Sequence, residues 1–242
     1  MMKRGLKEVI DDAREKGVNK IITIGVDLES CKKNIAIAKR FDNVYTAIGF
    51  HPHDSKKMKE EEISLLEEML TYSKNVAIGE IGLDFYYNHS NPEIQKEAFR
   101  KQLDLANKYD LPIIIHDRDA HQDTVKILAE KARGKKVVLH CFSGDIHMAK
   151  WCVEEGFYFG IGGVITFKNA HILSKVVQEI PLESILLETD SPYLTPHPFR
   201  GKPNEPQYIP LIAEKIAQLK GKTVRDIAQI STENAFQVFG LS

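Results

Sequence analysis

The chain contains four apolar, strand-like runs, each followed closely by a side chain that can bind a metal ion. They are Val76–Ile78 before Glu80, Pro112–Ile115 before His116, Val137–Leu139 before His140, and Ile185–Leu187 before Glu188 and Asp190. A strand that carries apolar side chains into a core and presents a polar group at its carboxyl end is typical of an α/β barrel, whose active site lies at those ends. Carboxylates and imidazoles together are ligands of divalent metals. We therefore predict that Glu80, His116, His140 and Asp190 meet at one metal site.

The order of the apolar segments predicts a parallel sheet covered by helices. Seven strand-like runs, beginning with Ile21–Ile24, alternate with amphipathic helices, and a helix precedes the first run. Continuously apolar strands joined by helices are typical of parallel sheets. A doubly wound open sheet is the alternative, but it gathers reactive residues at one switch point, whereas here polar residues follow almost every run. We predict a TIM-type (β/α)8 barrel that lacks its first strand, because a full barrel has eight.

Charge and cysteine content limit the partners and the compartment. Lys and Arg number 33 against 34 Asp and Glu, so any site for an anion must be local rather than a property of the whole surface. The cysteines, Cys31, Cys141 and Cys152, are odd in number and lack CxxC spacing, which is typical of a reduced protein. No apolar run is long enough for a membrane span, and the N-terminus lacks the apolar core of a signal peptide. These features predict a cytoplasmic protein with no membrane partner.

Five short motifs resemble those of the TatD family of metal-dependent hydrolases, several of which are deoxyribonucleases. They are Gly49-Phe50-His51-Pro52-His53, Gly79-Glu80-Ile81-Gly82-Leu83-Asp84, Pro112 through His116 with Arg118 and Ala120, His140-Cys141-Phe142-Ser143-Gly144, and Glu188-Thr189-Asp190-Ser191-Pro192. The resemblance covers the chain from end to end and implies a (β/α)8 barrel. It also implies that Glu80, His116, His140 and Asp190 are metal ligands, with Glu80 bridging two ions.

One feature of that family is absent. Its members begin with a strand that ends in His-x-His and supplies two ligands, and no such motif precedes residue 20. We expect residues 1–242 to form a single barrel domain that is incomplete at its N-terminus, either by loss or by a start placed too far downstream. The resemblance then implies one tightly bound ion at Glu80, His116 and His140 and a second bound weakly or not at all. His51-x-His53 occupies a separate family motif, so it would replace the absent pair only if two ions proved to bind tightly.

Phosphodiester hydrolysis suggests roles for the other polar groups near the strand ends. Asp190 and Glu80 are the candidate catalytic residues, with Asp190 accepting the proton of an attacking water. Five groups are candidates for binding phosphate: His51, His53, Arg118, Arg200 and Lys202. For Arg200 and Lys202, solvated loop charges are an equal alternative. The aromatic residues Phe85, Tyr86, Tyr87 and Tyr193 would either stack on a nucleobase or pack within their loops.

The function favoured by these residues is a metal-dependent hydrolase of phosphodiester bonds. The resemblance implies a TatD-type deoxyribonuclease acting at a 3′ end of DNA or RNA, with one or two Mg²⁺, Mn²⁺ or Zn²⁺ ions per chain. An amide or ester hydrolase or deacylase on the same barrel is the alternative, and a catalytically weakened relative is a third. The absent strand leaves two sheet edges unpaired, so self-association over that gap is also expected.

Overall fold

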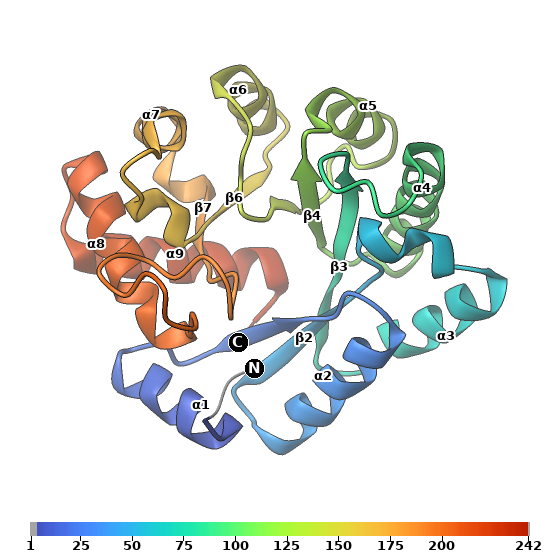
Figure 1. Cartoon of the computed structure of the whole chain (residues 1–242), viewed down its shortest axis with the longest axis horizontal. Coiled ribbons are helices and arrows are strands. Elements are labelled where there is room, and N and C mark those ends of the chain that lie inside the picture. Colours follow the sequence, from blue (N-terminus) through green and yellow to red (C-terminus); the bar gives the residue numbers. More distant parts are fainter. Residues whose placement is uncertain (1–3, 242) are drawn as a thin grey trace.

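Seven parallel strands form one curled sheet, with helices along its outer side (Figure 1). The computed structural model describes residues 4–241. The strands lie in chain order across the sheet: β1 (Ile21–Ile24), β2 (Val44–Ile48), β3 (Asn75–Asp84), β4 (Ile113–Arg118), β5 (Val137–Leu139), β6 (Tyr158–Ile161) and β7 (Ile185–Leu187). Strands that follow one another in this order, with the helices that connect them on one side, build a barrel rather than a doubly wound sheet. The barrel-type fold with seven strands beginning at Ile21 is therefore confirmed.

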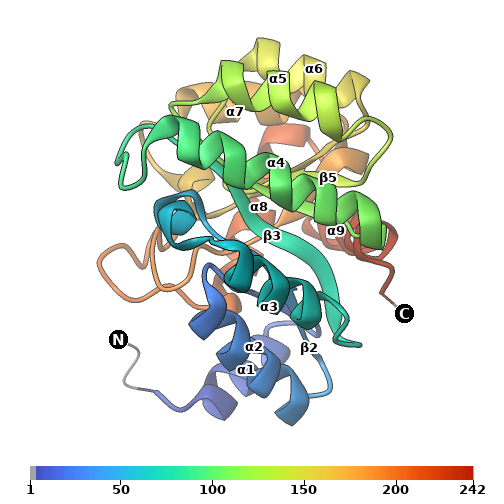
Figure 2. The ribbon, with the colours of Figure 1, turned by 90° about the vertical axis from the view of Figure 1, so that its right-hand side faces the viewer.

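Helices connect the strands and cover the outside of the sheet, where α2 to α5 lie side by side in chain order (Figure 2). The α-helices are α1 (Leu6–Glu15), α2 (Leu28–Arg40), α3 (Glu60–Leu70), α4 (Pro92–Tyr109), α5 (His121–Lys131), α6 (Ile146–Glu154), α7 (His171–Glu179), α8 (Ile209–Lys220) and α9 (Val224–Phe239). Four short 3-10 helices are η1 (Pro52–Lys57), η2 (Gly163–Thr166), η3 (Leu182–Ser184) and η4 (Pro206–Tyr208). None of the helices in residues 4–241 is both long and apolar enough to cross a bilayer.

Two strands end differently from the boundaries predicted by the sequence. β3 continues past Glu80 to Asp84, because Ile81 to Asp84 pair with Ile115 to Arg118 of β4. β4 likewise continues past His116 to Arg118, whereas β5 ends at Leu139, directly before His140, as its apolar run indicated. Glu80 thus lies within a paired strand, whereas His140 lies just after one.

The apolar side chains form two layers. A large cluster fills the space between the sheet and the helices, and a smaller one lies inside the barrel. The inner cluster takes one buried side chain from each of five strands, together with Val238 of α9: Ala47, Ala77, Ile114, Val138 and Leu186. Alternate residues of a strand point to opposite faces, so these strands are buried on both sides.

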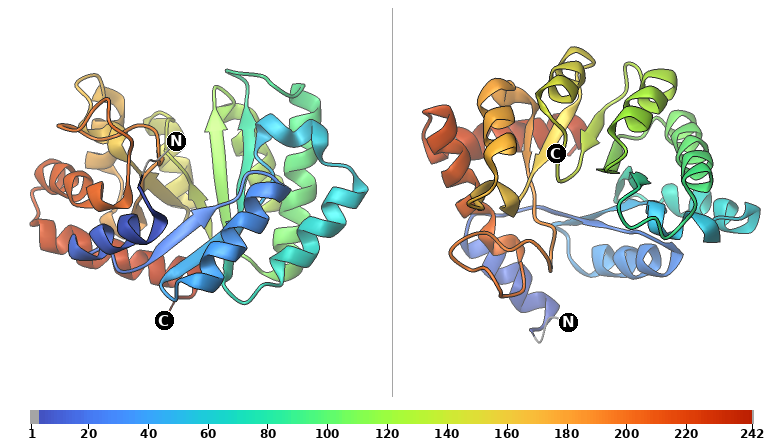
Figure 3. Two further views of the ribbon diagram at one scale, coloured as in Figure 1. Left: turned by 60° about the horizontal axis from the view of Figure 1, so that its bottom comes forward. Right: turned by 45° about the horizontal axis from the view of Figure 1, so that its top comes forward.

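Helix α9 crosses the amino ends of the strands (Figure 3). The Nζ atom of Lys136, just before β5, donates a hydrogen bond to the carbonyl of Gln237 at 2.6 Å. Lys20, just before β1, places its Nζ atom 5.3 Å from the centre of the Phe236 ring. The barrel is therefore closed at that end and accessible at the carboxyl ends of the strands, which we call the mouth.

The first and last strands are the edges of the sheet. Among residues 4–241, β1 pairs only with β2, and β7 pairs only with β6. All four residues of β1 are only partly buried, unlike the central strands. Near this seam, Arg4 forms an ion pair at 2.8 Å with the buried carboxylate of Glu205, which joins the start of α1 to the loop after β7.

Candidate metal centre

The four side chains predicted as metal ligands converge at the mouth. The Nδ1 atom of His116 lies 2.7 Å from Oε1 of Glu80, and Nε2 of His140 lies 3.9 Å from the same oxygen. Oδ1 of Asp190 is 3.7 Å from Nε2 of His140. The side chain of Asp190 is 38% exposed, against 12% for Glu80, so Asp190 is the carboxylate most open to solvent. The sequence therefore identified four side chains that the fold brings together, and their binding of a metal stays a prediction.

His51 joins the same cluster from the carboxyl end of β2. Its Nε2 atom is 3.7 Å from Oε1 of Glu80, and the ligand atoms of His51, Glu80 and His116 all lie within 4.8 Å of one another. The sequence analysis assigned His51 to phosphate binding and considered it as a ligand only in place of the absent His-x-His pair, because it lies in a motif separate from the predicted ligands. Its position makes it a geometric candidate for a metal ligand as well.

The hydrogen bonds of His51 favour a donor role. Its Nδ1 atom accepts the backbone N–H of His53 at 3.2 Å. Burial lowers the pKa of His51 to about 4, so the ring is neutral near pH 7. A neutral ring carries a single proton, which must then reside on Nε2, the atom that faces Glu80. Nε2 can thus donate a hydrogen bond to an oxygen at the cluster.

His116 and His140 are each held from behind by a second carboxylate. The Nε2 atom of His116 is 3.0 Å from Oδ2 of Asp84, and the Nδ1 atom of His140 is 2.8 Å from Oε2 of Glu188. Metal-bound histidines usually donate their second N–H to such a carboxylate, which fixes the tautomer and directs the other nitrogen at the metal. Asp84 and Glu188 lie in the motifs named in the sequence analysis, which assigned them no role. Their spacing, four residues after Glu80 and two before Asp190, was the available signal.

The charges of the cluster are strongly coupled. Burial alone would raise the pKa of Glu80, but His140 and His116 hold it well below the usual range. Burial likewise opposes charge on His116, yet hydrogen bonds to Asp84 and Glu80 raise its pKa to about 9. The pKa of His140 is also raised, against burial, by Glu188 and Glu80. The cluster thus pairs anionic oxygens with imidazoles that carry protons. A divalent ion could take the place of those protons, so this set of donors fits such an ion.

Two glycines allow the strands and side chains of the site to approach closely. Gly82 has φ +140°, and a Cβ atom there would lie 2.1 Å from the carbonyl oxygen of His116. A Cβ atom at Gly160 would lie 2.1 Å from Oε2 of Glu188. The first glycine lets β3 and β4 come together behind the cluster, and the second leaves room for the carboxylate that holds His140.

His53 lies one contact further from the cluster. Its Nε2 atom is 2.9 Å from Oδ2 of Asp84, the oxygen that also faces His116. It is therefore linked to the candidate ligands through a shared carboxylate.

The predicted phosphate-binding cations lie against aromatic rings. The guanidinium of Arg118 is 4.1 Å from the Tyr86 ring centre, and that of Arg200 is 4.0 Å from the Phe167 ring centre. Lys202 lies 5.3 Å from the ring centre of Phe199. Within residues 4–241, no hydrogen bond or ion pair joins these three cations to the cluster. Their binding of phosphate stays a prediction.

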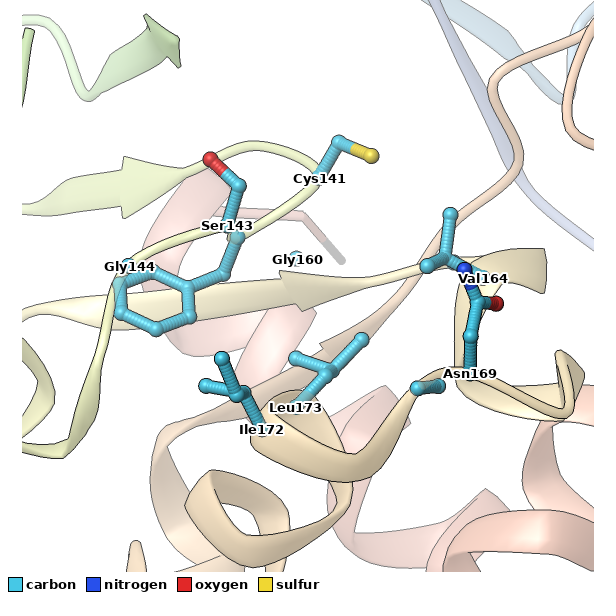
Figure 4. Close-up of a pocket in the computed structure, with 11 residues that line it drawn as sticks. Cys141, Ser143, Gly144, Gly160, Val164, Asn169, Ile172 and Leu173 are labelled. Atoms are coloured by element: carbon cyan, nitrogen blue, oxygen red, sulfur yellow. The ribbon is translucent and has the colours of Figure 1, made fainter. Parts of the chain in front are cut away.

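A hollow of about 250 Å³ opens beside His140 (Figure 4). Cys141 and Ser143 of the loop after β5 line one side, and Ile172 and Leu173 of α7 line the other. Burial raises the pKa of the Cys141 thiol to about 12, and Glu188 adds to this effect. The thiol is thus protonated near pH 7.

The barrel is closed at the amino ends of its strands and carries imidazoles and carboxylates at its mouth, which is an arrangement found in metal-dependent hydrolases. The family model of the TatD related DNases matches residues 2–240. The chain belongs to that family.

Relatives and solved structures agree with this assignment. The chain is 45% identical over 238 residues, 98% of its length, to the uncharacterized metal-dependent hydrolase YabD of Bacillus subtilis, of which 93% is covered. It is 35% identical over 243 residues to the 3'-5' ssDNA/RNA exonuclease TatD of Escherichia fergusonii, covering 97% of this chain and 93% of the relative. The crystal structure of the TatD homologue YJJV from Escherichia coli superposes with a TM-score of 0.92 at 32% identity, covering 98% of this chain and 92% of that one. The relative from Bacillus subtilis is named a metal-dependent hydrolase with no stated substrate, whereas the relative from Escherichia fergusonii is named an exonuclease of single-stranded DNA and RNA.

Proposed function

We propose that this hydrolase removes nucleotides from the 3′ end of single-stranded DNA or RNA. The proposal is supported by the relative from Escherichia fergusonii, which is named a 3'-5' ssDNA/RNA exonuclease. The relative from Bacillus subtilis is named only as a metal-dependent hydrolase. The choice of substrate therefore depends on the groups around the cluster.

The arrangement of the two histidines around Glu80 is the observation that carries the proposal. Each directs one nitrogen toward Glu80 and has the other nitrogen on a carboxylate, Asp84 for His116 and Glu188 for His140. A divalent ion held there would lower the pKa of a water and neutralise charge on a phosphate. Glu80, His116 and His140 would hold the ion, and Asp190 would complete its ligands.

The remaining groups are suited to proton transfer and to holding an anion. Asp190, the most exposed carboxylate of the cluster, accepts the proton of the attacking water. His51 donates through Nε2 to a phosphate oxygen, and His53 lies next to it with its ring held by Asp84. Arg118 and Arg200 supply paired N–H donors that match phosphate geometry.

An end-labelled assay tests this function. A single-stranded oligonucleotide labelled at its 5′ end, incubated with Mg²⁺, Mn²⁺ or Zn²⁺, should shorten in steps from its 3′ end. Glu80→Gln keeps the shape of the side chain but removes its charge, and should lower the rate about 100-fold or more. Glu61→Gln, an exposed glutamate of α3, is the matched control and should leave the rate unchanged.

Two further substrates make the outcome decisive. A phosphorothioate linkage at the 3′ terminus should block shortening, whereas internal cuts in that oligonucleotide would contradict exonuclease action. Amide and ester substrates are offered in parallel. Metal-dependent cleavage of these, with intact DNA and RNA, would contradict the nuclease proposal and favour the amide or ester hydrolase.

A further inference from the structure

Two exposed tyrosines follow β3, directly beside the cluster of candidate metal ligands. The side chains of Tyr86 and Tyr87 are 58% and 52% exposed, although large aromatic residues are normally buried. Their rings contact edge to face, with centres 4.9 Å apart. Tyr87 also stacks on the ring of His89, with centres 5.6 Å apart, yet both tyrosines remain more than half exposed among residues 4–241. We call Tyr86 and Tyr87 the tyrosine surface.

Arg118 fixes a positive charge against the tyrosine surface. Its guanidinium lies 4.1 Å from the ring centre of Tyr86 and 4.8 Å from that of Tyr87, within the range of cation–π attraction. The contact is set by the sheet, because Asp84 pairs with Arg118 across β3 and β4, and the N–H of Phe85 donates to the Arg118 carbonyl at 2.9 Å. The cation and the rings are therefore held together by paired strands rather than by the loop alone.

Asp84 links the tyrosine surface to the cluster of candidate metal ligands. Its Oδ1 atom accepts the backbone N–H of Tyr87 at 2.8 Å, while its Oδ2 atom faces His53 and His116. The ring of His53 also contacts that of Tyr87 edge to face, with centres 5.5 Å apart. One carboxylate thus fixes both the orientation of a candidate ligand and the start of the aromatic loop.

We propose that the tyrosine surface stacks on a nucleobase of single-stranded nucleic acid while Arg118 binds a phosphate of the same strand. This inference rests on the proposed nuclease function. It states which groups of the substrate, bases and phosphates, would contact the mouth near β3 and β4. Every nucleobase has a flat π face, so stacking holds a strand without reading its sequence. A guanidinium beside the rings adds charge-assisted hydrogen bonds to the backbone. The predicted preference is for a base-bearing strand of any sequence over a bare sugar–phosphate chain.

Equilibrium binding of two fluorescent oligomers tests this proposal. One is a single-stranded oligothymidylate, and the other is an abasic oligomer of the same length and charge, both with phosphorothioate linkages that slow cleavage. The holoenzyme should bind the base-bearing oligomer more tightly. The double change Tyr86→Leu with Tyr87→Leu should weaken that binding about 5- to 100-fold and leave binding of the abasic oligomer unchanged. Arg118→Gln should instead weaken the binding of both oligomers and make their affinity less dependent on salt.

Tyr72→Leu is the matched control. Tyr72 lies just before β3, at the end of the strand opposite the mouth, and Lys39 is 5.8 Å from its ring centre. This variant should bind both oligomers as the unaltered chain does. The double change to phenylalanine keeps both rings and should retain the preference for bases, which separates loss of stacking from loss of folding.

The outcomes distinguish this inference from the nuclease proposal. If the leucine variant lost the same affinity for both oligomers, or lost affinity for neither, the stacking role would be overturned. Preference for the base-bearing oligomer without any cleavage of natural DNA or RNA would contradict the nuclease function and leave the tyrosine surface as a binding site.

Discussion

Each of the histidines His116 and His140 has one ring nitrogen near Glu80 and the other on a carboxylate that does not belong to the predicted ligand set. His51 differs, because its second nitrogen accepts a backbone N–H. A histidine that accepts on one nitrogen carries its proton on the other, and so donates where a ligand would have to accept. The three imidazoles around Glu80 are therefore not equivalent.

This difference predicts distinct effects of two alanine substitutions. His140→Ala removes a predicted ligand and is expected to lower affinity for Mn²⁺ about 100-fold or more. His51→Ala is expected to leave that affinity nearly unchanged and to slow cleavage about 100-fold, the usual effect of losing one donor to a developing anion. Titration calorimetry with Mn²⁺ and the rate of oligonucleotide shortening measure the two effects. Loss of the metal in His51→Ala would instead make His51 a ligand that replaces part of the absent His-x-His pair.

The raised pKa of His116 predicts how metal binding depends on pH. The pKa of about 9 means that the ring is protonated below that pH, so an ion that binds its Nδ1 atom must displace a proton. Affinity for Mn²⁺ should therefore rise with pH and level off above about pH 9, with protons released on binding at pH 7. Calorimetry in two buffers of different ionisation enthalpy counts those protons.

Asp84→Asn provides the control for this pH dependence. It removes one of the two carboxylates that hold the proton on His116, so the rise in affinity should shift to lower pH. The affinity itself should fall about 10- to 100-fold, as for other partners of a ligand histidine. An unchanged pH profile would show that Asp84 does not control the protonation of His116.

At the scale of the elements, the approach of β3 to β4 shows what the sequence could and could not predict. Each apolar run identified a strand, and the candidate ligands that follow four of these runs come together at the mouth, because the carboxyl ends of parallel strands share one edge. The sequence did not predict that β3 continues to Asp84, or that His51 reaches Glu80. Both depend on the register between neighbouring strands, which the pattern of a single strand does not contain.

Gly82 offers a test of that close approach. A Cβ atom there would meet the His116 carbonyl at 2.1 Å, and φ is +140°. Gly82→Ala is therefore expected to destabilise the fold by about 3 kcal/mol through overlap and backbone strain, and to lower the melting temperature by roughly 10 °C. The displaced His116 should also weaken Mn²⁺ binding.

Gly134→Ala separates the two causes. Gly134 also has a positive φ, +72°, but no atom of the described residues lies within 4 Å of the position that a Cβ atom would take there. This variant should lose about 1 kcal/mol from backbone strain alone and bind Mn²⁺ normally. Equal losses in the two variants would mean that the contact with His116 is unimportant.

At the scale of the whole molecule, the sheet formed by residues 4–241 is open between β1 and β7, and each residue of β1 is only partly buried. Arg4, two residues before α1, contacts the loop after β7 through its ion pair with Glu205. A strand placed ahead of α1 would end near Arg4, at the mouth, and would run parallel to both edges. Sheet edges without partners leave backbone N–H and C=O groups free to pair with another strand, from the same chain or another copy.

Adding such a strand is expected to stabilise the protein. A strand-forming segment fused ahead of residue 4 should raise the melting temperature by about 5 °C or more, because several hydrogen bonds of about 1 kcal/mol each would form at the seam. Differential scanning calorimetry at several protein concentrations measures this and also detects pairing between copies. A melting temperature that stays the same on fusion would show that the seam is already compensated.

A grafted strand that ends in His-x-His adds a second measurement. Metal analysis should find about one tightly bound ion per chain without the graft and two with it, since carboxylates alone are weak ligands for a second ion. Two tightly bound ions in the ungrafted chain would mean that His51 or His53 has replaced the absent pair.

Helix α9 limits where substrate and product can enter and leave the barrel. Because Val238 and the inner cluster fill the barrel and α9 covers the amino ends of the strands, a polymer cannot be threaded through the ring of strands. Substrate, water and product must all enter and leave on the same side. For the proposed nuclease function, the choice between a free end and the middle of a nucleic acid would therefore depend on the loops on that side, where residues 85–91 and 189–206 lie on different sides of the opening (Figure 1).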